Sequence, residues 1–372
     1  MVSYPVDASD ITLDWMREAL AANGHLGDFE LVKCEARDSD VPGQTAEIVL
    51  LSVEYNDSAC PLPTRFVAKL ASRNQMVIDQ IIRVYDLYRR ESAFYTEFED
   101  SGIAVPDCYL CQHDPETQQL VILMADLAPS RSPSWVPTPE ETELALSRLP
   151  AFHAKWWNNP MLRERDWLVQ FDDKNFFSAG AGAANMAKPL LDEHFDGAGQ
   201  HTAELMTLFQ ENIDNLLAYS GTRPFTFVHG DYHPKQMFFP TEEGGKFAVI
   251  DWQFPFVGQG AWDFVRMMVL GLDVEERRAR QDRLIENYYQ GLLDNGVTDY
   301  TMEDLQKDLR TGILVNQMIM MVALIDTDVS LVEKECTALG VDWKDVMILR
   351  GEAAVRDWQG VDFVKQVIAE AS

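Results

Sequence analysis

Basic residues are scarce in this chain of 372 residues. It has 31 lysines and arginines against 60 aspartates and glutamates, which gives a formal net charge of -29. Nucleic acids and anionic membrane surfaces attract basic protein faces, so we expect the chain to bind neither of them. The acidity is spread over both halves of the chain, which favours a generally solvated surface over a single cation-attracting cleft.

Cysteine is also rare and forms no framework for disulfides. The five cysteines are Cys34, Cys60, Cys108, Cys111 and Cys336. An odd number without regular spacing suits a reducing compartment. Cys108 and Cys111 form one C-x-x-C pair without a second pair, which does not indicate a zinc site.

Neither a leader-like start nor a long apolar run is present. The N-terminal residues 1–20 lack a basic region followed by an apolar core, and no uninterrupted apolar stretch of about eighteen residues occurs. We therefore expect a cytoplasmic protein without a membrane partner.

Glycine is sparse between two predicted strands, residues 29–35 and 47–55. The connecting residues 37–46 contain only Gly43. Such a loop can cover phosphate groups through its backbone N–H groups. An ordinary hairpin loop explains the same residues equally well, so both interpretations stay open.

The most informative stretch is FVHGDYHPKQMFFPTEEGGKFAVIDWQ, residues 227–253. It predicts a short apolar strand, a polar loop and a hairpin closed by two adjacent glycines. Asp231 lies in the polar loop, and Asp251 ends the last strand. Two carboxylates at the ends of neighbouring strands can face one cleft, with the amide of Gln236 between them, and this arrangement suits phosphoryl transfer.

The spacing H-G-D-x-x-x-x-Q followed by I-D-W corresponds to the H-R-D-x-x-x-x-N and D-F-G motifs of protein kinases. The form of the first motif at residues 229–231 resembles the aminoglycoside phosphotransferase and choline kinase group of the protein-kinase-like superfamily. The segments IDWQ at 250–253, GAWDF at 260–264 and LPAFHAKWW at 149–157 are most similar to its ecdysteroid-kinase-like (CHK kinase-like) branch. The chain departs from the family pattern at Gln236, where the family has asparagine.

The resemblance implies an α+β, protein-kinase-like fold with two lobes. The N-terminal nucleotide-binding lobe, residues 1–126, would hold an antiparallel sheet plus a helix, and the larger, mostly helical lobe, residues 127–372, would hold the catalytic and acceptor-binding residues. A segment rich in proline and serine at 129–139 supports a boundary there. Helical periodicity predicts four further helices at 264–271, 274–295, 302–324 and 342–371.

A lysine and a glutamate are expected to pair in the first lobe. Lys69 lies inside the apolar strand 65–70, where an ammonium group is costly unless it is paired. Glu91 falls on the apolar stripe of a predicted helix, residues 76–98. The alternative is that Lys69 reaches solvent and Glu91 belongs to an exposed charge cluster. By the resemblance, the pair would hold the α- and β-phosphates of the nucleotide.

The resemblance also implies roles for the remaining site residues. Asp231 would orient and deprotonate the acceptor hydroxyl, while Asp251 and Gln236 would bind Mg²⁺. The residues whose backbone would hydrogen-bond an adenine ring are Met124, Ala125 and Asp126.

Three further features receive structural predictions. Asp263 fits a helix N-cap and, by the resemblance, would brace the catalytic loop. His153 is predicted to be a hydrogen-bonded core residue. The sequence AGAGAA at 179–184 is predicted to be a flexible spot in the region 158–222, which is expected to be helical and broken by loops.

The resemblance therefore implies an ATP- and Mg²⁺-dependent phosphotransferase that acts on the hydroxyl group of a small molecule. A catalytically degenerate, kinase-like nucleotide-binding module is the first alternative, because it explains both Gln236 and the glycine-poor loop. A metallohydrolase that uses His229, Asp231, His233 and Asp251 is the second. The sequence predicts neither the acceptor nor the oligomeric state.

Overall fold

The computed structural model describes residues 2–39, 43, 45–98, 100–326 and 329–371. The chain forms two compact units. The first unit comprises Met1–Arg131 and Pro240–Phe254, and the second comprises Ser132–Phe239 and Pro255–Ser372. The division predicted between residues 126 and 127 did not include this return of the chain to the first unit.

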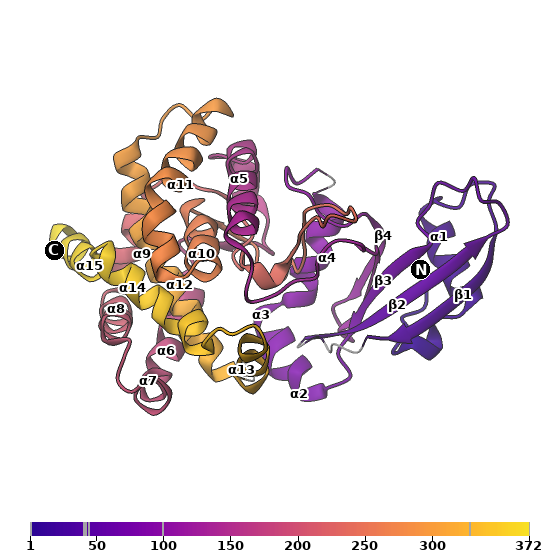
Figure 1. The fold of residues 1–372 in the computed structure, drawn as a ribbon, viewed down its shortest axis with the longest axis horizontal. Coiled ribbons are helices and arrows are strands. Elements are labelled where there is room, and N and C mark those ends of the chain that lie inside the picture. Colours follow the sequence, from indigo (N-terminus) through magenta and orange to yellow (C-terminus); the bar gives the residue numbers. More distant parts are fainter. Residues whose placement is uncertain (1, 40–42, 44, 99, 327–328, 372) are drawn as a thin grey trace. The chain divides into compact units, whose positions relative to one another are not determined.

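The first unit is built on a five-stranded antiparallel sheet with the order β1-β2-β3-β5-β4 (Figure 1). Its strands are β1 (Leu31–Asp38), β2 (Ala46–Tyr55), β3 (Arg65–Ala71), β4 (Cys108–Asp114) and β5 (Gln119–Ala125). Alternation along β3 places Phe66, Ala68 and Leu70 in one apolar core, which also contains buried residues of helix α1 (Leu13–Ala22). Ile122 and Met124 of β5 belong to a second core. The predicted N-terminal antiparallel sheet and the α+β class are confirmed.

The predicted single helix at 76–98 is wrong, because the chain breaks at Asp86. The observed elements are α2 (Gln75–Val77), a π-helical turn (Ile78–Ile82), α3 (Arg83–Tyr85) and α4 (Leu87–Glu97). Asp86 has a φ of 53°, in the left-handed region that aspartate tolerates better than most residues. The apolar periodicity continues on both sides of the break, so the sequence pattern alone does not reveal it.

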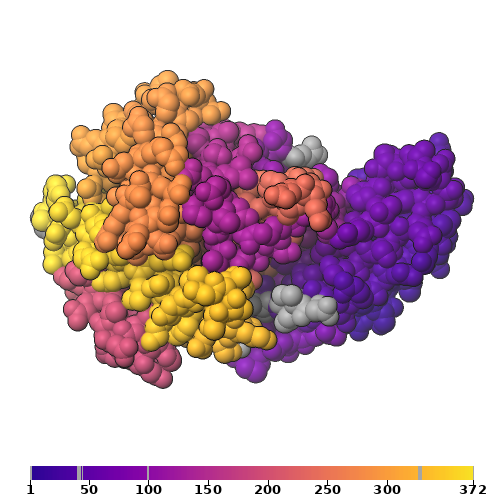
Figure 2. Space-filling model, in the orientation of Figure 1, coloured from indigo at the N-terminus to yellow at the C-terminus, as the bar shows by residue number. Residues whose placement is uncertain are grey.

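The second unit is mostly helical, as predicted (Figure 1). Its helices are α5 (Pro139–Lys155), α6 (Lys174–Met186), α7 (Lys188–Phe195), α8 (Gln200–Glu211), α9 (Ile213–Gly221), α10 (Ala261–Gly271), α11 (Val274–Asp294), α12 (Met302–Asp326), α13 (Val329–Ala338), α14 (Arg350–Asp357) and α15 (Gly360–Ala371). Every residue of α10 is buried, and this helix packs against α5 and α12. The C-terminal helices, yellow in Figure 2, come to the surface of the unit.

Short strands support the loops of both units. In the second unit, β6 (Val169–Gln170), β10 (Phe256–Gly258) and β7 (Thr226–Val228) form a small sheet in that order. Strand β8 (Met237–Phe238) also lies in the second unit, and β9 (Ala248–Val249) lies in the first. The predicted C-terminal helix at 342–371 is divided into a π-helical turn (Asp345–Leu349), α14 and α15.

The flexible spot predicted at 179–184 is instead part of a regular helix, because these residues lie inside α6. A Cβ atom added at Gly180 would lie 2.9 Å from Sδ of Met318 on α12. Small residues in this stretch therefore allow α6 and α12 to approach each other closely.

Within the part of the chain that the structure describes, one helix is long and apolar enough to cross a membrane by length and composition. It is the segment Met302–Ile325 of α12, and 72% of its most apolar window is buried inside the protein. A core helix is also buried to this extent, and α12 packs against α6 and α10.

Two helical glycines lead to opposite stability predictions. A Cβ at Gly351 of α14 would lie 1.9 Å from Oε1 of the fully buried Gln317, whereas nothing lies within 4 Å of a Cβ at Gly182 of α6. We expect Gly351→Ala to lower the free energy of unfolding by about 1–3 kcal/mol through overpacking. Gly182→Ala should raise it by about 0.5–1 kcal/mol through helix propensity. Chemical denaturation measures both, and shifts of equal sign would contradict the packing described here.

Candidate functional site

Lys69, Glu91, Asp251 and Gln253 form a buried polar group in the first unit, which we call the lysine cluster. Nζ of Lys69 lies 2.7 Å from Oε2 of Glu91 and 2.8 Å from Oδ1 of Asp251. The side chains of Lys69 and Glu91 are 9% and 1% exposed, and that of Asp251 is 28% exposed. The predicted pairing of Lys69 with Glu91 is confirmed, and the alternative of a solvent-exposed lysine is wrong.

Charge pairing keeps this lysine protonated despite its burial. Burial disfavours the ammonium group, but the carboxylates of Asp251 and Glu91 outweigh it and raise the pKa of Lys69 above its ordinary value. Burial raises the pKa of Glu91, and Lys69 opposes this effect. Gln253 completes the cluster, because its Nε2 donates to Oε2 of Glu91 at 3.1 Å and its Oε1 accepts from Oγ1 of Thr45 at 3.0 Å.

Aromatic stacking positions Asp251 beside the lysine. Its neighbour Trp252 is fully buried and stacks on Phe94 of α4, with ring centroids 3.8 Å apart and an interplanar angle of 3°. Asp251 itself has a φ of 65°, in the left-handed region. The stack therefore joins the residues after β9 to the same helix that carries Glu91.

Two of the predicted adenine-binding N–H groups already have partners in the first unit. The backbone N–H of Ala125 donates to the carbonyl of Asp107 at 2.9 Å, and that of Asp126 donates to the carbonyl of Arg65 at 3.2 Å. Adenine recognition through these groups would require new partners for both carbonyls, so the role of Met124, Ala125 and Asp126 stays a prediction. Four residues of the predicted phosphate-covering loop 37–46, namely 40–42 and 44, lie outside the described residues, so this interpretation stays open.

The second unit holds the HGD loop, which we define as residues 229–236. It follows β7 and ends in the 3-10 turn Pro234–Gln236. The carboxylate of Asp263 accepts hydrogen bonds from the backbone N–H groups of His229 at 2.7 Å and Gly230 at 2.9 Å. Gly230 has a φ of 78°, which glycine adopts without a steric penalty. Asp263 therefore braces the loop, as the resemblance implied.

The predicted N-cap role of Asp263 is wrong. Gly260 is the N-cap of α10, and Asp263 lies within the first turn of the helix. Ala261 and Trp262 already have helical geometry, so the carboxylate is directed towards the HGD loop instead of its own helix end.

His153 is a buried, hydrogen-bonded core residue, as predicted. Its Nδ1 lies 2.7 Å from the hydroxyl of Tyr288, and its Nε2 lies 3.4 Å from Oδ2 of Asp263. The imidazole thus contacts the same carboxylate that holds the HGD loop.

Asp231 is surrounded by hydrogen-bond donors. Its Oδ1 accepts from Nη2 of Arg266 at 2.5 Å and from Nε of the same residue at 3.0 Å. Its Oδ2 accepts from Nε2 of Gln236 at 3.2 Å and lies 3.2 Å from Nε2 of His233. The side chain is 18% exposed. Both carboxylate oxygens are therefore held in a defined orientation.

The same neighbours keep Asp231 ionised. Burial would raise the pKa of Asp231, but His233 and Arg266 outweigh it and lower the pKa well below its ordinary value. Burial lowers the pKa of His233, and the carboxylate of Asp231 opposes this effect. Arg266 contributes a guanidinium group beside Asp231.

Arg266 is not among the site residues predicted from the sequence. The sequence does indicate that this residue is paired, because it lies within the apolar run AWDFVRMMVLG. A buried guanidinium group is costly without a partner, as is the ammonium group of a lysine within an apolar strand. The identity of that partner depends on how α10 packs against the HGD loop, which the sequence does not give.

The oxygen ligands predicted for Mg²⁺ have suitable chemistry. Mg²⁺ in phosphotransferases is bound by one or two carboxylates together with substrate phosphates and water, so a dense protein cage is not required. Asp251 offers a partly exposed carboxylate, and Gln236 retains an amide carbonyl oxygen while its Nε2 donates to Asp231.

The residues proposed for a metallohydrolase are engaged differently. No group of three or more histidine, cysteine, aspartate or glutamate side chains suited to a metal ion occurs among the described residues. Asp231 is bound by Arg266, and His233 is hydrogen-bonded to Asp231 and stacks on Trp135 with ring centroids 4.8 Å apart. Lys235, whose role the sequence left open, pairs with Glu335 of α13 at 2.5 Å.

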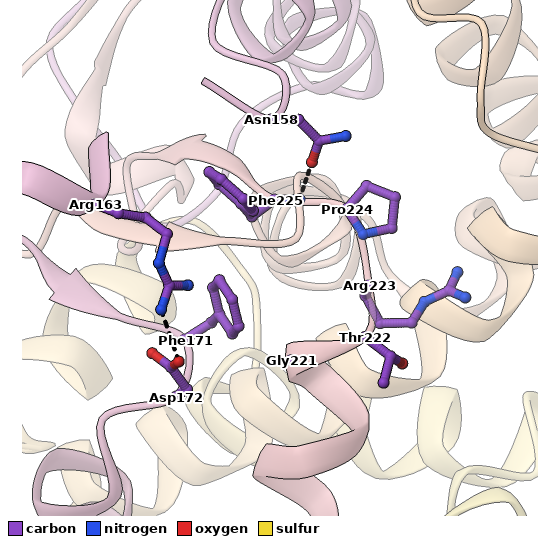
Figure 3. Close-up of a pocket in the computed structure, with 9 residues that line it drawn as sticks. All are labelled: Asn158, Arg163, Phe171, Asp172, Gly221, Thr222, Arg223, Pro224 and Phe225. Carbon is purple, nitrogen blue, oxygen red and sulfur yellow. Dashed lines mark hydrogen bonds and ion pairs between the residues drawn. The ribbon is translucent and has the colours of Figure 1, made fainter. Parts of the chain in front are cut away.

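A separate cavity of about 480 Å³ opens within the second unit (Figure 3). It is lined by Asn158, Arg163, Phe171, Asp172, Gly221, Thr222, Arg223, Pro224 and Phe225. None of the predicted site residues lines it. Its charges are also compensated, because Arg163 pairs with Asp172 at 2.8 Å and Arg223 pairs with Asp304 and Asp308.

Comparison of sequences finds one matching family model and two relatives of low identity. Residues 180–339 match the family model DUF1679, described as "Uncharacterized oxidoreductase dhs-27". The chain is 25% identical over 247 residues to "Uncharacterized kinase-like protein D1044.1" of Caenorhabditis elegans, covering 60% of this chain and 62% of that protein. It is 22% identical over 319 residues to "Uncharacterized oxidoreductase dhs-27" of the same organism, covering 77% of this chain and 38% of that protein. The chain thus spans less than two thirds of either relative.

Comparison of structures finds small-molecule kinases at low similarity. A choline kinase from Cryptosporidium parvum Iowa II is 10% identical, with a TM-score of 0.49, covering 90% of this chain and 91% of that chain. The choline kinase LicA from Streptococcus pneumoniae is 12% identical, with a TM-score of 0.46, covering 93% and 98%. The sequence matches, taken with the H-G-D and I-D-W motifs, confirm the resemblance to the kinase-like group and its CHK kinase-like branch.

Proposed function

We propose that this chain is an ATP- and Mg²⁺-dependent phosphotransferase that acts on the hydroxyl group of a small molecule. The observation that carries the proposal is the lysine cluster, in which a buried ammonium group contacts two carboxylates, one of them partly exposed. Buried ion pairs of this kind add little net stability, and they occur frequently where a charged ligand is bound. The free cysteines agree with action in a reducing cytoplasm.

The lysine cluster would hold the nucleotide. In the proposed complex, Lys69 contacts the α- and β-phosphates, and Glu91 keeps the lysine directed towards them. Asp251 and Gln236 would hold Mg²⁺, which supplies neutralisation of the phosphate charge. Asp251 already accepts a hydrogen bond from Lys69 at 2.8 Å, so nucleotide binding exchanges part of this contact for contacts to phosphate.

Asp231 would accept a hydrogen bond from the acceptor hydroxyl and, late in the reaction, its proton. Its lowered pKa makes it a weak base, so its main contribution is orientation of the attacking oxygen. A loose phosphoryl-transfer transition state requires little basicity in this position.

A catalytically degenerate nucleotide-binding module remains the second candidate, because Gln236 replaces the asparagine of the family. That candidate predicts a Mg²⁺-dependent rise in melting temperature with ATP but no phosphorylation of any alcohol. A screen of small alcohols for ATP-dependent phosphorylation separates the two candidates.

The first prediction for this function concerns the proposed base. Asp231→Asn should fold normally and bind ATP, but its kcat should fall about 10²–10⁴-fold, because the amide neither orients the hydroxyl as a carboxylate does nor takes its proton. Steady-state kinetics with the acceptor found in the screen measure the effect. Asp172→Asn, a change in the separate cavity, is the matched control and should retain wild-type kcat. A near wild-type rate for Asp231→Asn would remove Asp231 from the mechanism.

A second prediction concerns the lysine cluster. Lys69→Met should strongly weaken ATP binding and kcat/KM, and Glu91→Gln should weaken them less. The double variant should lose less than the sum of the two free-energy losses, because both residues act on the same phosphate contact. A double-mutant cycle in kcat/KM provides the measurement. Strictly additive losses would show that the pair does not work as a unit.

A third prediction concerns Gln236. Gln236→Ala should raise the Mg²⁺ concentration needed for half-maximal rate, because only water can replace the deleted oxygen ligand. Gln236→Asn should leave the rate within about tenfold of wild type, or ~1.4 kcal/mol in transition-state terms. Titration of the rate with Mg²⁺ tests both. An alanine variant with unchanged Mg²⁺ requirement and unchanged rate would exclude Gln236 as a ligand.

A further inference from the structure

Arg266 of α10 is held at both ends of its guanidinium group. Nε and Nη2 donate to Oδ1 of Asp231 at 3.0 and 2.5 Å. Nη1 donates to Oδ1 of Asn316 at 3.1 Å and to Sδ of Met320 at 3.4 Å. The residue is 4% exposed, so this arrangement is inside the protein. One edge of the guanidinium group therefore donates to the HGD loop, and its remaining nitrogen donates to side chains of α12.

The contact to Asn316 continues as a chain of hydrogen-bonded side chains, which we call the polar ladder: Arg266, Asn316, Gln317, Thr202 and Glu352. The first four are buried, and the side chain of Glu352 is 14% exposed. Nδ2 of Asn316 donates to Oε1 of Gln317 at 3.1 Å. Nε2 of Gln317 donates to Oγ1 of Thr202 at 2.7 Å, and this hydroxyl donates to Oε2 of Glu352 at 2.8 Å. Four helices, α10, α12, α8 and α14, are linked in this way.

The polar ladder has only one consistent direction. A guanidinium group can only donate, so Asn316 must present its oxygen to Arg266 and its NH₂ group to Gln317. Gln317 must then present its oxygen to Asn316 and its NH₂ group to Thr202, and the hydroxyl of Thr202 must donate to Glu352. An ionised carboxylate can only accept, so Glu352 terminates the ladder. A buried network in which every member is satisfied in a single arrangement is rigid.

The end of the polar ladder is anchored to the backbone. Oε2 of Glu352 also accepts from the backbone N–H of Thr202 at 2.8 Å, and Oε1 accepts from Nδ1 of His201 at 2.7 Å. Both residues lie at the start of α8, where a carboxylate is favoured by the helix dipole. Gly351 provides the space for Gln317, since a Cβ there would overlap its amide.

We propose that Arg266 is the positioning residue for Asp231, and that the polar ladder fixes its guanidinium so that the carboxylate keeps one orientation. A purely structural pair would tolerate replacement by apolar side chains of similar volume. The two donors aimed at one oxygen of Asp231, and the rigid support behind them, instead match the requirements for holding a reacting group in place. The catalytic part of this inference rests on the proposed function.

Hydrogen–deuterium exchange of the HGD loop tests the positioning without any assay of activity. In Arg266→Met, the amides of residues 229–236 should exchange several-fold faster than in wild type, and Arg266→Lys should restore part of the protection. Arg277→Met is the matched control, because Arg277 is also buried but hydrogen-bonds to Gln281 and Asp357, which are not members of the polar ladder. It should leave exchange in residues 229–236 unchanged.

Kinetics give the second measurement. Arg266→Met should lower kcat by about 10–100-fold, with each KM within about twofold of wild type, because the base is misplaced while the binding groups remain. Thr202→Val breaks the polar ladder without touching Asp231 or Arg266, and it should lower kcat by a smaller factor with the same unchanged KM values. Arg277→Met should keep wild-type kcat.

The outcomes separate this inference from the proposed function. Wild-type exchange in residues 229–236 of Arg266→Met would overturn the positioning role, as would a loss of kcat no larger than in Arg277→Met. If Arg266→Met does not fold, Arg266→Lys decides, because wild-type exchange and kcat in this variant would show that the two-donor geometry is not needed. A wild-type protein that phosphorylates no alcohol would defeat the proposed function alone, and the exchange comparison would still decide the role of Arg266.

Discussion

Buried charges that must be paired hold the predicted site side chains in place in each unit. Lys69 is held by Glu91 and Asp251, and Asp231 is held by Arg266. Removing one partner of such a pair leaves an uncompensated charge in the protein interior and costs about 3–5 kcal/mol. These side chains are therefore fixed by the folded chain before any ligand arrives, which is the condition for electrostatic preorganisation.

The backbone of the HGD loop depends on another buried carboxylate. Asp263 accepts two adjacent backbone N–H groups of the loop and also contacts His153 of α5. Because Asp263 and Arg266 lie one turn apart on α10, this helix controls both the path of the loop and the orientation of Asp231. The full burial of α10 explains why its positions are well defined, since a helix packed on all sides has little freedom to shift.

The sequence predicted those features that follow from a local rule. A lysine within an apolar strand requires a partner, and the stripe on the next helix supplied Glu91. The break at Asp86, the helical course of AGAGAA and the return of residues 240–254 to the first unit were not predictable in this way. Each depends on which surfaces meet in three dimensions. At Gly180, for example, the absence of a side chain leaves room for Met318 of α12, and nothing in the local pattern identifies that neighbour.

Arg266 shows that the same local rule can identify a residue without identifying its function. A buried arginine in α10 needs an acceptor, and the candidates in the sequence include every acidic residue of a strongly acidic chain. Only the packing of α10 selects Asp231, and only the direction of the polar ladder explains why the guanidinium does not turn away from it. In the proposed reaction, a carboxylate held this firmly gains orientation at the expense of basicity. Phosphoryl transfer tolerates that exchange, because its transition state needs the attacking oxygen in line more than it needs a strong base.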